Sequence, residues 1–181
     1  MVRDWRIELV KIYPDLFHPV GDPPVAQGFP DVRDGWCDLL ERACARIQAV
    51  VQTSGGSFNF RQIKQKWGCA QLYWEGSLSP EADACVQEAV ALAVARSACT
   101  CEICGEPGRL YSDRAHRPPT ATRCTQHADG RSLTVVRPGF ENIHIKSWPA
   151  SDGCMNRYHR YERETDCFVD VDPNSLGIDE E

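Results

Sequence analysis

Four residues in the middle of the chain have the types and the spacing of a metal site. Cys101 and Cys104 form a C-x-x-C pair, and Cys124 and His127 form a C-x-x-H pair further along. Three thiolates and one imidazole complete the tetrahedral shell that Zn2+ prefers. Because four protein ligands leave no position for water, we expect the ion to be structural and to take no part in catalysis. The spacing of the two pairs is typical of zinc knuckles, so we predict Zn2+ at these four residues.

Two nearby residues could replace a predicted ligand. Cys99 could stand in for Cys101, although Cys99-x-Cys101 is a poorer knuckle than Cys101-x-x-Cys104. His116 lies between the two pairs in a Pro-rich insert, residues 114–119, and a loop histidine is more often exposed than ligating. Without a metal this part of the chain would be polar and poorly packed, and small metal modules fold when they bind their ion.

Composition and cysteine usage favour a cytosolic globular protein. The 181 residues, 42% hydrophobic and 25% charged, suit one domain or one domain with a small appendage. No apolar run reaches about 18 residues, so no membrane span is expected, and the N-terminal residues lack the layout of a secretory signal. In this setting the ten cysteines do not indicate a disulfide framework. Cys37, Cys44 and Cys85 occur in apolar helical patterns, where we expect them as small buried hydrophobes.

Apolar periodicity predicts the first helices. A short helix begins at Trp5 and stops near Pro14, and a loop rich in Pro and Gly follows over residues 19–30. The stripe of apolar residues over 36–51 has the period of a helix packed on a core, and Asp34 is in position to cap it.

A second strong helix begins after residue 78. Ser79 suits its N-cap and Pro80 its first turn. The segment between the two strong helices, residues 58–74, is ambiguous. The aromatic and apolar residues of its first part are spaced for a short helix, whereas residues 69–74 suit a strand.

The C-terminal part contains a hairpin pattern and an acidic end. Residues 132–136 and 140–145 are β-prone runs on either side of a turn that contains Pro138 and Gly139, which predicts a β-hairpin. Residues 164–181 contain seven acids and no Lys or Arg, in a chain with a net charge of −6. Such a segment is typical of a solvated, flexible tail.

Together these elements predict an α+β fold. It would have a helical N-terminal part with a short strand segment, a structural zinc knuckle or ribbon, and a C-terminal β-hairpin. We divide the chain into a mainly helical region (1–98), a zinc-knuckle module packed on it (99–130), a hairpin with an extension (131–163) and a flexible acidic tail (164–181).

Several motifs carry a family resemblance. After Tyr13-Pro14-Asp15-Leu16-Phe17 the chain has a GW-x-x-L-L element (35–40), a K-x-K-[FW]-G element (64–68) and a C-x-x-C-G…C-x-x-H-A motif (101–128). This order resembles a family of small proteins, without an established activity, that is frequent in bacteriophages and prophages of proteobacteria. The resemblance covers roughly residues 10–128. The chain departs from the family in its Pro-rich insert between the metal pairs and in its extension from about Arg131. The resemblance implies a phage or mobile-element setting.

We therefore expect a non-enzymatic accessory protein that binds a host macromolecule in the bacterial cytosol, with a host protein as the first candidate. It could inhibit a defence factor or a factor that handles nucleic acid, and the acidic tail could imitate DNA on a basic surface. Residues 157–161 are a further contact strip or an exposed helix face. The candidate aromatic anchors, each of which could equally belong to the core, are Tyr73, Trp74, Trp148 and Tyr158.

Two other functions compete with this hypothesis. The first is nucleic-acid binding by the metal segment, whose arginines could contact phosphates and whose tyrosine could stack on a base. The residues concerned are Arg109, Tyr111, Arg114, Arg117, Arg123 and Arg131. The second is a zinc-scaffolded nuclease of the HNH type, which would use His116. That histidine lacks a neighbouring His or Asn in a convincing array, and no H-x-E order indicates a zinc deaminase.

Overall fold

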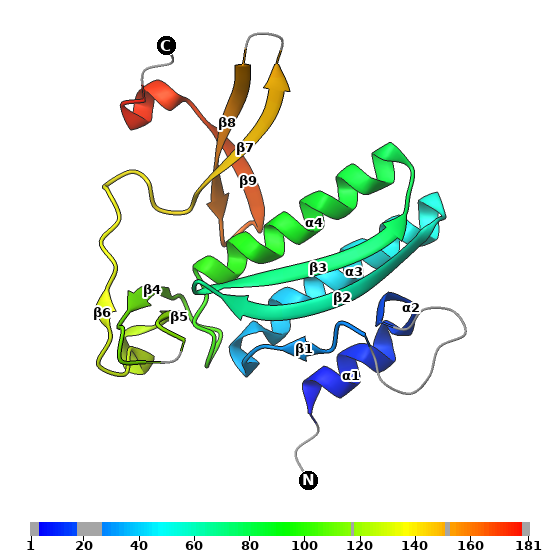
Figure 1. The fold of residues 1–181 in the computed structure, drawn as a ribbon, viewed down its shortest axis with the longest axis horizontal. Helices are drawn as coiled ribbons and strands as arrows, with labels where there is room; N and C mark the ends of the chain where they lie inside the picture. The colour runs from blue at the N-terminus through cyan, green and yellow to red at the C-terminus, as the bar shows by residue number, and fades with distance from the viewer. Residues whose placement is uncertain (1–3, 18–26, 117, 151–152, 179–181) are drawn as a thin grey trace. The chain divides into compact units, whose positions relative to one another are not determined.

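The computed structural model describes residues 4–17, 27–116, 118–150 and 153–178. It has an α+β fold, as expected, with helices and three small sheets (Figure 1). The chain forms two compact units, Met1–Leu133 and Thr134–Glu181. Among the described residues, no helix has both the length and the apolar character needed to cross a membrane.

The first unit contains most of the regular structure. Its helices are α1 (Trp5–Ile12), α2 (Pro14–Phe17), α3 (Cys37–Ser54) and α4 (Pro80–Ala98), with short 3-10 turns η1 (Asp34–Trp36) and η2 (Thr125–His127). Its strands are β1 (Pro30–Asp31), β2 (Ser57–Lys66), β3 (Cys69–Ser77), β4 (Arg109–Ser112), β5 (Thr120–Arg123) and β6 (Ser132–Leu133). The strands form two sheets, in the orders β1-β2-β3 and β5-β4-β6.

Helix α3 confirms the predicted apolar stripe but not its predicted cap. Leu39, Leu40 and Ile47 are buried on the face that meets the core. Asp34 does not cap α3; its carboxylate instead accepts a hydrogen bond from Trp5 Nε1 at 2.9 Å. An aspartate therefore fastens α1 to the segment before α3.

Helix α4 begins as predicted. The Ser79 hydroxyl accepts a hydrogen bond from the backbone N–H of Ala82, and Pro80 stands in the first turn. The expectation for the helical cysteines holds for Cys44, which is buried, but is wrong for Cys85, which is exposed. Cys37 is half-buried.

The ambiguous segment is a β-hairpin, β2–β3, and contains no helix. A β-bulge at Arg61 explains the misleading spacing. Because the bulge adds one residue, Phe60 and Ile63 lie three positions apart and still point to the same buried face. Three-residue spacing is otherwise typical of a helix, so the sequence pattern alone could not distinguish the two.

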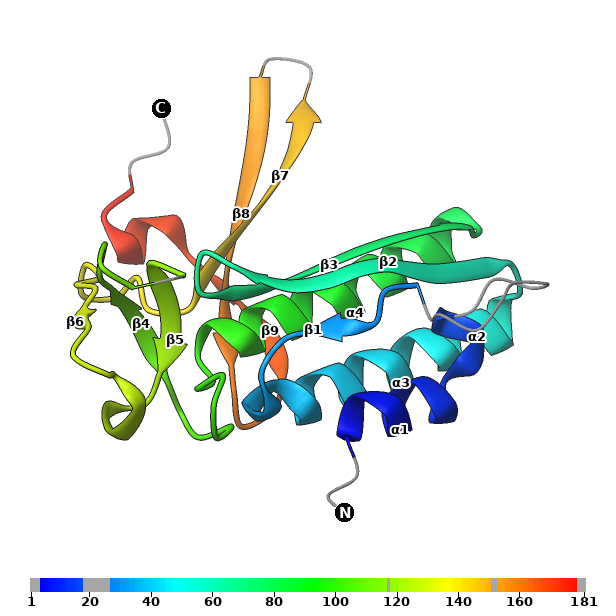
Figure 2. The ribbon, with the colours of Figure 1, turned by 60° about the horizontal axis from the view of Figure 1, so that its bottom comes forward.

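One face of the hairpin packs against the helices of the first unit (Figures 1 and 2). Phe58 and Phe60 meet edge to face at 4.8 Å between ring centroids, and Trp74 stacks on Phe58 at 5.1 Å. The same cluster contains Trp36 of η1 and Val86 of α4. The hydrophobic core therefore lies between the hairpin and helices α3 and α4.

The second unit is a three-stranded antiparallel sheet in the order β7-β8-β9. Its elements are β7 (Ile143–Ala150), β8 (Gly153–Glu162), β9 (Cys167–Val171) and the 3-10 turn η3 (Pro173–Leu176). The predicted hairpin of residues 132–136 with 140–145 is wrong. β6 pairs with β4, and β7 pairs with β8, so the C-terminal hairpin lies further along the chain.

The acidic end is not a free tail over its described length. Residues 167–171 form β9, which pairs with β8, and the buried Asp166 accepts a hydrogen bond from the Tyr161 hydroxyl. Residues 157–161 lie in β8, so the expected helix face there is also wrong. Most of the loop at 19–30, together with residues 179–181, lies outside the described residues.

Candidate metal centre

The first ligand pair lies in a tight loop between α4 and β4. A backbone bridge between Thr100 and Pro107 closes the loop, and the N–H of Cys101 donates to Glu106 O at 2.8 Å. Gly105 ends the loop with a φ of +79°, in the left-handed region where only glycine is free of strain. The C-x-x-C-G order therefore has a local reason, because the turn that aims both sulfurs needs glycine after Cys104.

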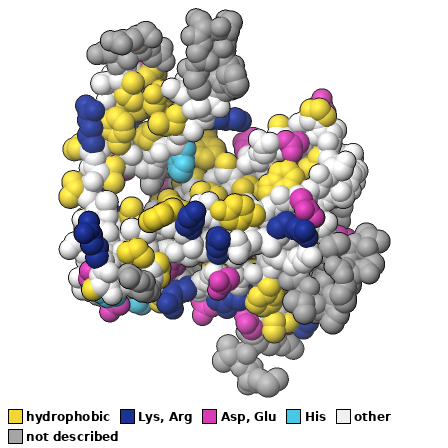
Figure 3. All heavy atoms as spheres, in the orientation of Figure 1, with side chains coloured by type: hydrophobic (Ala, Val, Ile, Leu, Met, Phe, Trp, Pro, Cys, Tyr) yellow, Lys and Arg dark blue, Asp and Glu magenta, His cyan; other side chains and the backbone are white. Residues whose placement is uncertain are grey.

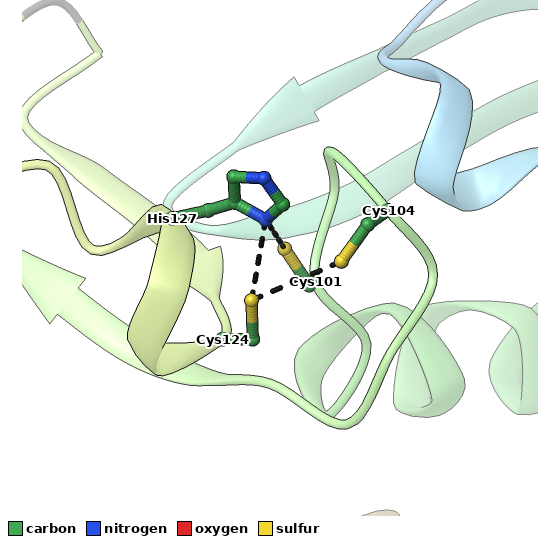
Figure 4. A group of neighbouring side chains, drawn as sticks. All are labelled: Cys101, Cys104, Cys124 and His127. Atoms are coloured by element: carbon green, nitrogen blue, oxygen red, sulfur yellow. Dashed lines mark hydrogen bonds between the residues drawn. The ribbon is translucent and has the colours of Figure 1, made fainter.

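The second ligand pair comes from the end of a strand. Cys124 directly follows β5, and His127 ends the 3-10 turn η2. The N–H of His127 donates to Cys124 O at 3.1 Å, so one turn of backbone places both side chains on the same side. The two pairs belong to separate segments that meet only in the tertiary structure (Figure 4).

The four ligand atoms have the separations of a tetrahedral metal shell. All lie within 4.8 Å of one another. The Sγ atoms of Cys104 and Cys124 are 3.8 Å apart, and His127 Nδ1 lies 3.6 Å from Cys101 Sγ and 3.2 Å from Cys124 Sγ (Figure 4). With zinc bonds of about 2.3 Å to sulfur and about 2.0 Å to nitrogen, tetrahedral edges are about 3.8 Å and about 3.5 Å. The arrangement therefore suits one divalent ion bound through three sulfurs and Nδ1.

The thiol pKa values favour binding of a cation. Burial raises the pKa of Cys101, but backbone N–H groups of Cys104, Cys124 and Ile103 aimed at its sulfur outweigh burial and lower the pKa to about 6. For Cys104 the N–H of Glu106 lowers the pKa, but burial and the neighbouring sulfurs of Cys101 and Cys124 together raise it above its usual value. One thiolate thus forms readily, whereas a second beside it needs a positive ion.

A buried ion pair links the two ligand segments. Glu102 lies between the first two cysteines, and Arg123 directly precedes Cys124. Arg123 Nη2 lies 2.7 Å from Glu102 Oε1, and their side chains are 8% and 2% exposed. Arg33, which is largely exposed, lies 3.4 Å from the same oxygen. Burial raises the pKa of the Glu102 carboxyl even though these arginines oppose the shift. We call the Glu102–Arg123 contact the knuckle ion pair.

The GW element packs directly on the first ligand loop. The N–H of Gly35 donates to Glu102 O at 3.0 Å, and Trp36 Nε1 donates to Thr100 O at 3.0 Å from a fully buried indole. A Cβ on Gly35 would lie under 3.0 Å from backbone atoms of Cys101, Glu102 and the residue at 105. The glycine is needed because two backbones approach this closely.

The K-x-K-W-G element packs on the strand that leads to Cys124. Gly68 O accepts a hydrogen bond from Thr122 Oγ1 at 2.6 Å, and Gln65 Nε2 donates to Thr120 O at 2.8 Å. A Cβ on Gly68 would lie closer than 3.0 Å to a methyl group of Leu110. The GW element and the K-x-K-W-G element therefore hold the metal segment against the rest of the first unit.

The two competing ligands lie elsewhere. Cys99 is buried and its thiol donates to Arg96 O at 3.3 Å, at the C-terminus of α4. His116 Nδ1 lies 3.0 Å from Asp113 Oδ2, and its Nε2 lies 3.6 Å from Asp129 Oδ2. Both ring nitrogens of His116 therefore face carboxylates, away from the four predicted ligands. Among the described residues, only the four predicted ligands form a group of His, Cys or carboxylate atoms that could hold a metal.

The arginines of the metal segment do not form one basic surface. Arg123 and Arg131 are each only 7% exposed, and the ring of Tyr111 is 8% exposed. Arg109 and Arg114 are exposed, and Arg117 lies outside the described residues. Two of the five arginines thus serve the interior, which weakens the case for a nucleic-acid contact on this segment.

The proposed aromatic anchors have different surroundings. Tyr73 is 44% exposed, whereas Trp74 stacks on Phe58 at the edge of the core. Tyr158 is half-buried in β8, and the side chain of Trp148 lies outside the described part of the chain.

The residues that support the site were not recognised from the sequence. Glu102 and Arg123 each adjoin a predicted ligand. A charged residue, Glu102, inside the tight loop between Cys101 and Cys104 was the only hint in the sequence of a buried ion pair. No pattern within one segment shows that these two charges meet, since they are 21 positions apart in the chain.

Comparisons with known proteins add no assignment to this geometry. No protein-family model, no curated protein and no solved structure matches the chain.

Proposed function

We propose that this chain is a zinc-stabilised, non-enzymatic binding protein. The single observation that carries the proposal is the set of ligand-atom separations, which match the edges of a closed tetrahedron of three sulfurs and one nitrogen. Thiolate-rich sets of this kind select Zn2+ over harder ions. With Cys101, Cys104, Cys124 and His127 all ligating, water has no position on the metal.

The surroundings of the site support a structural role for the ion. The knuckle ion pair joins the two ligand segments to each other, and Gly35 and Gly68 fasten them to the rest of the first unit. An ion at this place would fix the loop between α4 and β4 against the N-terminal helices and the β2–β3 hairpin. The proposed role of zinc is to make that part of the molecule rigid.

The partner that we propose is a host protein in the bacterial cytosol. The support is the resemblance of residues 10–128 to phage and prophage proteins, together with a rigid body that suits the occupation of another protein's surface. Inhibition of a defence factor or of a nucleic-acid-handling factor is the form of action that we propose. The second candidate is nucleic-acid binding. The surface that favours it is the outward side of the β2–β3 hairpin, which lies outside the metal segment.

Metal analysis and spectroscopy test the zinc proposal. Protein purified without added metal should contain about one zinc per chain. Replacement by Co2+ should give the absorption of a tetrahedral sulfur-rich site, and Cys104→Ser, at the most exposed ligand, should weaken it. An absence of bound metal, or a five-coordinate spectrum with bound water, would contradict the structural role.

A binding experiment tests the proposed partner. The tagged chain should retain one bacterial protein in a fixed ratio, and the complex should form again from the two purified components. Failure to form any complex from purified components would contradict a protein partner and leave the zinc result unaffected.

A further inference from the structure

The turn between β2 and β3 contains a residue that its backbone does not favour. Lys66 pairs with Cys69, so Trp67 and Gly68 form a two-residue loop, and their φ angles are +56° and +83°. Positive φ at both positions defines a type I′ turn, which prefers Asn-Gly. The other described residues with positive φ, apart from glycines, are the usual Asn and Asp types at 129, 142 and 166.

The strain at Trp67 has no compensation in the interior. The Trp67 side chain is 67% exposed, whereas Gly68 beside it packs on Leu110. A bulky residue at positive φ is unfavourable for the backbone, and the exposed Trp67 ring gains no packing in the interior to offset this cost. Such places are frequent at functional sites, where an outside partner uses the residue.

The hairpin carries further aromatic and cationic side chains on the same outward face. Because Ile63 and Leu72 point into the core, their neighbours Lys64 and Tyr73 point outward. Lys64 Nζ lies 5.5 Å from the Tyr73 ring centroid, so cation and ring stand side by side. We define the hairpin face as the outward side chains Gln62, Lys64, Lys66, Trp67, Gln71 and Tyr73.

The charge of this region differs in sign from that of the chain. Residues 57–77 contain the cations Arg61, Lys64 and Lys66 and the single acid Glu75, a net charge of +2 in a chain of −6. Arg61 pairs with Glu75 at 3.1 Å, and Asp31 of β1 lies in register with Lys64. Cations therefore exceed carboxylates even with both acids counted. Figure 3 shows Lys and Arg side chains interspersed with hydrophobic ones over the hairpin.

We propose that the hairpin face binds single-stranded nucleic acid. Trp67 and Tyr73 would each stack on an unpaired base, while Lys64 and Lys66 would contact phosphates. The strand between Cys69 and Tyr73 spans about 13 Å, at about 3.3 Å per residue, so the two rings are far enough apart to stack on different bases. Gln62 and Gln71 lie on the same face and could hydrogen-bond base edges. A duplex would not suit this surface, because its bases are already stacked.

This function stands beside the proposed protein partner and does not depend on it. It uses the metal segment only as a support, because Gly68 and Gln65 fasten the base of the turn to β4 and β5.

Fluorescence anisotropy with defined probes tests the proposal. The probes are fluorescein-labelled 15-mers of one mixed sequence, as single-stranded DNA, single-stranded RNA and duplex DNA, with zinc-loaded full-length protein. Binding of either single strand, more tightly than the duplex, is the expected result, and the DNA and RNA arms identify which is preferred. Between about 50 mM and about 200 mM salt the affinity should fall, because phosphate contacts release counterions.

Two variants separate the contribution of the ring from that of the charges. Trp67→Asn should reduce affinity about 5- to 160-fold, the range for loss of one stacked base. Its melting temperature should be equal or higher, since Asn suits positive φ. The double variant Lys64→Gln/Lys66→Gln should reduce the salt slope by about 1.4, at about 0.7 per phosphate contact. Two matched controls lie on α1. Ile12→Asn should leave the affinity for the single strand unchanged, and Lys11→Gln should leave the salt slope unchanged.

Other results would overturn the proposal. They are no binding of either single strand at low salt, equal affinity for the duplex, or a Trp67→Asn variant that binds as well as the wild type. Loss of a purified host-protein complex in Trp67→Asn, without any oligonucleotide binding by the wild type, would make the hairpin face a protein-docking surface instead. The zinc content of each preparation, measured in parallel, distinguishes these outcomes from a failure of the metal site.

Discussion

Arg123 Nη2 and Glu102 Oε1 lie 2.7 Å apart in the interior, and each residue adjoins metal ligands of a different segment. The contact therefore joins the loop of Cys101 and Cys104 to the strand β5, which leads to Cys124, without any ion. A metal that binds here meets ligands that are already close to their final positions. We expect this preorganisation to set both the stability of the first unit and its affinity for zinc.

Breaking the knuckle ion pair should destabilise the protein. Arg123→Met leaves the buried Glu102 carboxylate facing the largely exposed Arg33, 3.4 Å away, in place of a buried partner, and the free energy of unfolding in urea should fall by about 3 kcal/mol. Zinc affinity, measured by competition with a chromophoric chelator, should fall about 10- to 100-fold. The double variant Glu102→Leu/Arg123→Met removes both charges and should recover most of the stability. A double variant less stable than the single one would contradict this account.

The Gly35→Ala substitution should disturb the metal loop without touching a ligand. The added Cβ would lie under 3.0 Å from backbone atoms at Cys101 and Glu102, so one of the two backbones must move. We expect a loss of about 1–3 kcal/mol in unfolding free energy together with weaker zinc binding. Gly55→Ala is the control. A Cβ added at Gly55 would have no group beyond its chain neighbours within 4 Å. Only the backbone φ of +72° would then cost free energy, about 1 kcal/mol. Zinc binding by this control variant should be unchanged.

Removal of the metal should loosen one defined part of the chain. After treatment with a chelator, hydrogen exchange should increase over residues 99–133 and at the turn of β2–β3, whereas the middle of α3 should stay protected. Binding of the metal should release protons, because Cys104 has a raised pKa. With a pKa of about 6 for Cys101, protons compete for that ligand mainly below this pH. Uniform loss of protection would show that the metal supports the whole first unit.

The second unit should lose stability in mild acid. Burial, and to a smaller degree the imidazole of His159, lowers the pKa of His144 below its usual value. The unfolded chain then binds more protons than the folded one as the pH falls below about 6.5, so stability is full above this pH and declines below it. Asp170 Oδ1 lies 2.8 Å from His159 Nδ1, so this carboxylate pairs with His159 and does not stabilise the protonated form of His144.

Hydrogen exchange of β8 at pH 7.5 and at pH 5.5 measures this effect. Protection should fall at the lower pH in the wild type and stay nearly constant in His144→Phe, which keeps a ring against Phe168. An equal fall in both proteins would place the titrating group elsewhere.

Truncation distinguishes a structural C-terminus from a free tail. Ending the chain after Glu164 removes β9, which pairs with β8, and also Asp166, which accepts the Tyr161 hydroxyl. The β7–β8 hairpin alone is marginal in water, so we expect the second unit to unfold, as seen by loss of exchange protection. Ending the chain after Ile178 should change nothing. An intact second unit after the shorter truncation would restore the picture of a free acidic tail.

The sequence alone determined the features that depend on local spacing. Cys101, Cys104, Cys124 and His127 were predicted as one group because knuckle spacing is a property of short segments, and their ligand atoms lie within 4.8 Å of one another. The α+β class and the start of α4 at Ser79 followed from periodicity and capping, which are also local.

Only the tertiary structure decided what depends on contact between distant segments. The bulge at Arg61 gives the β2 strand a helix-like spacing, and only its pairing with β3 reveals the strand. The charge of the acidic end predicts a flexible tail. β9 nevertheless completes a sheet, because backbone hydrogen bonding between strands does not depend on the net charge of the segment. Glu102 and Arg123 are ordinary charged residues until folding removes both from water, and desolvation then makes each of them depend on the other.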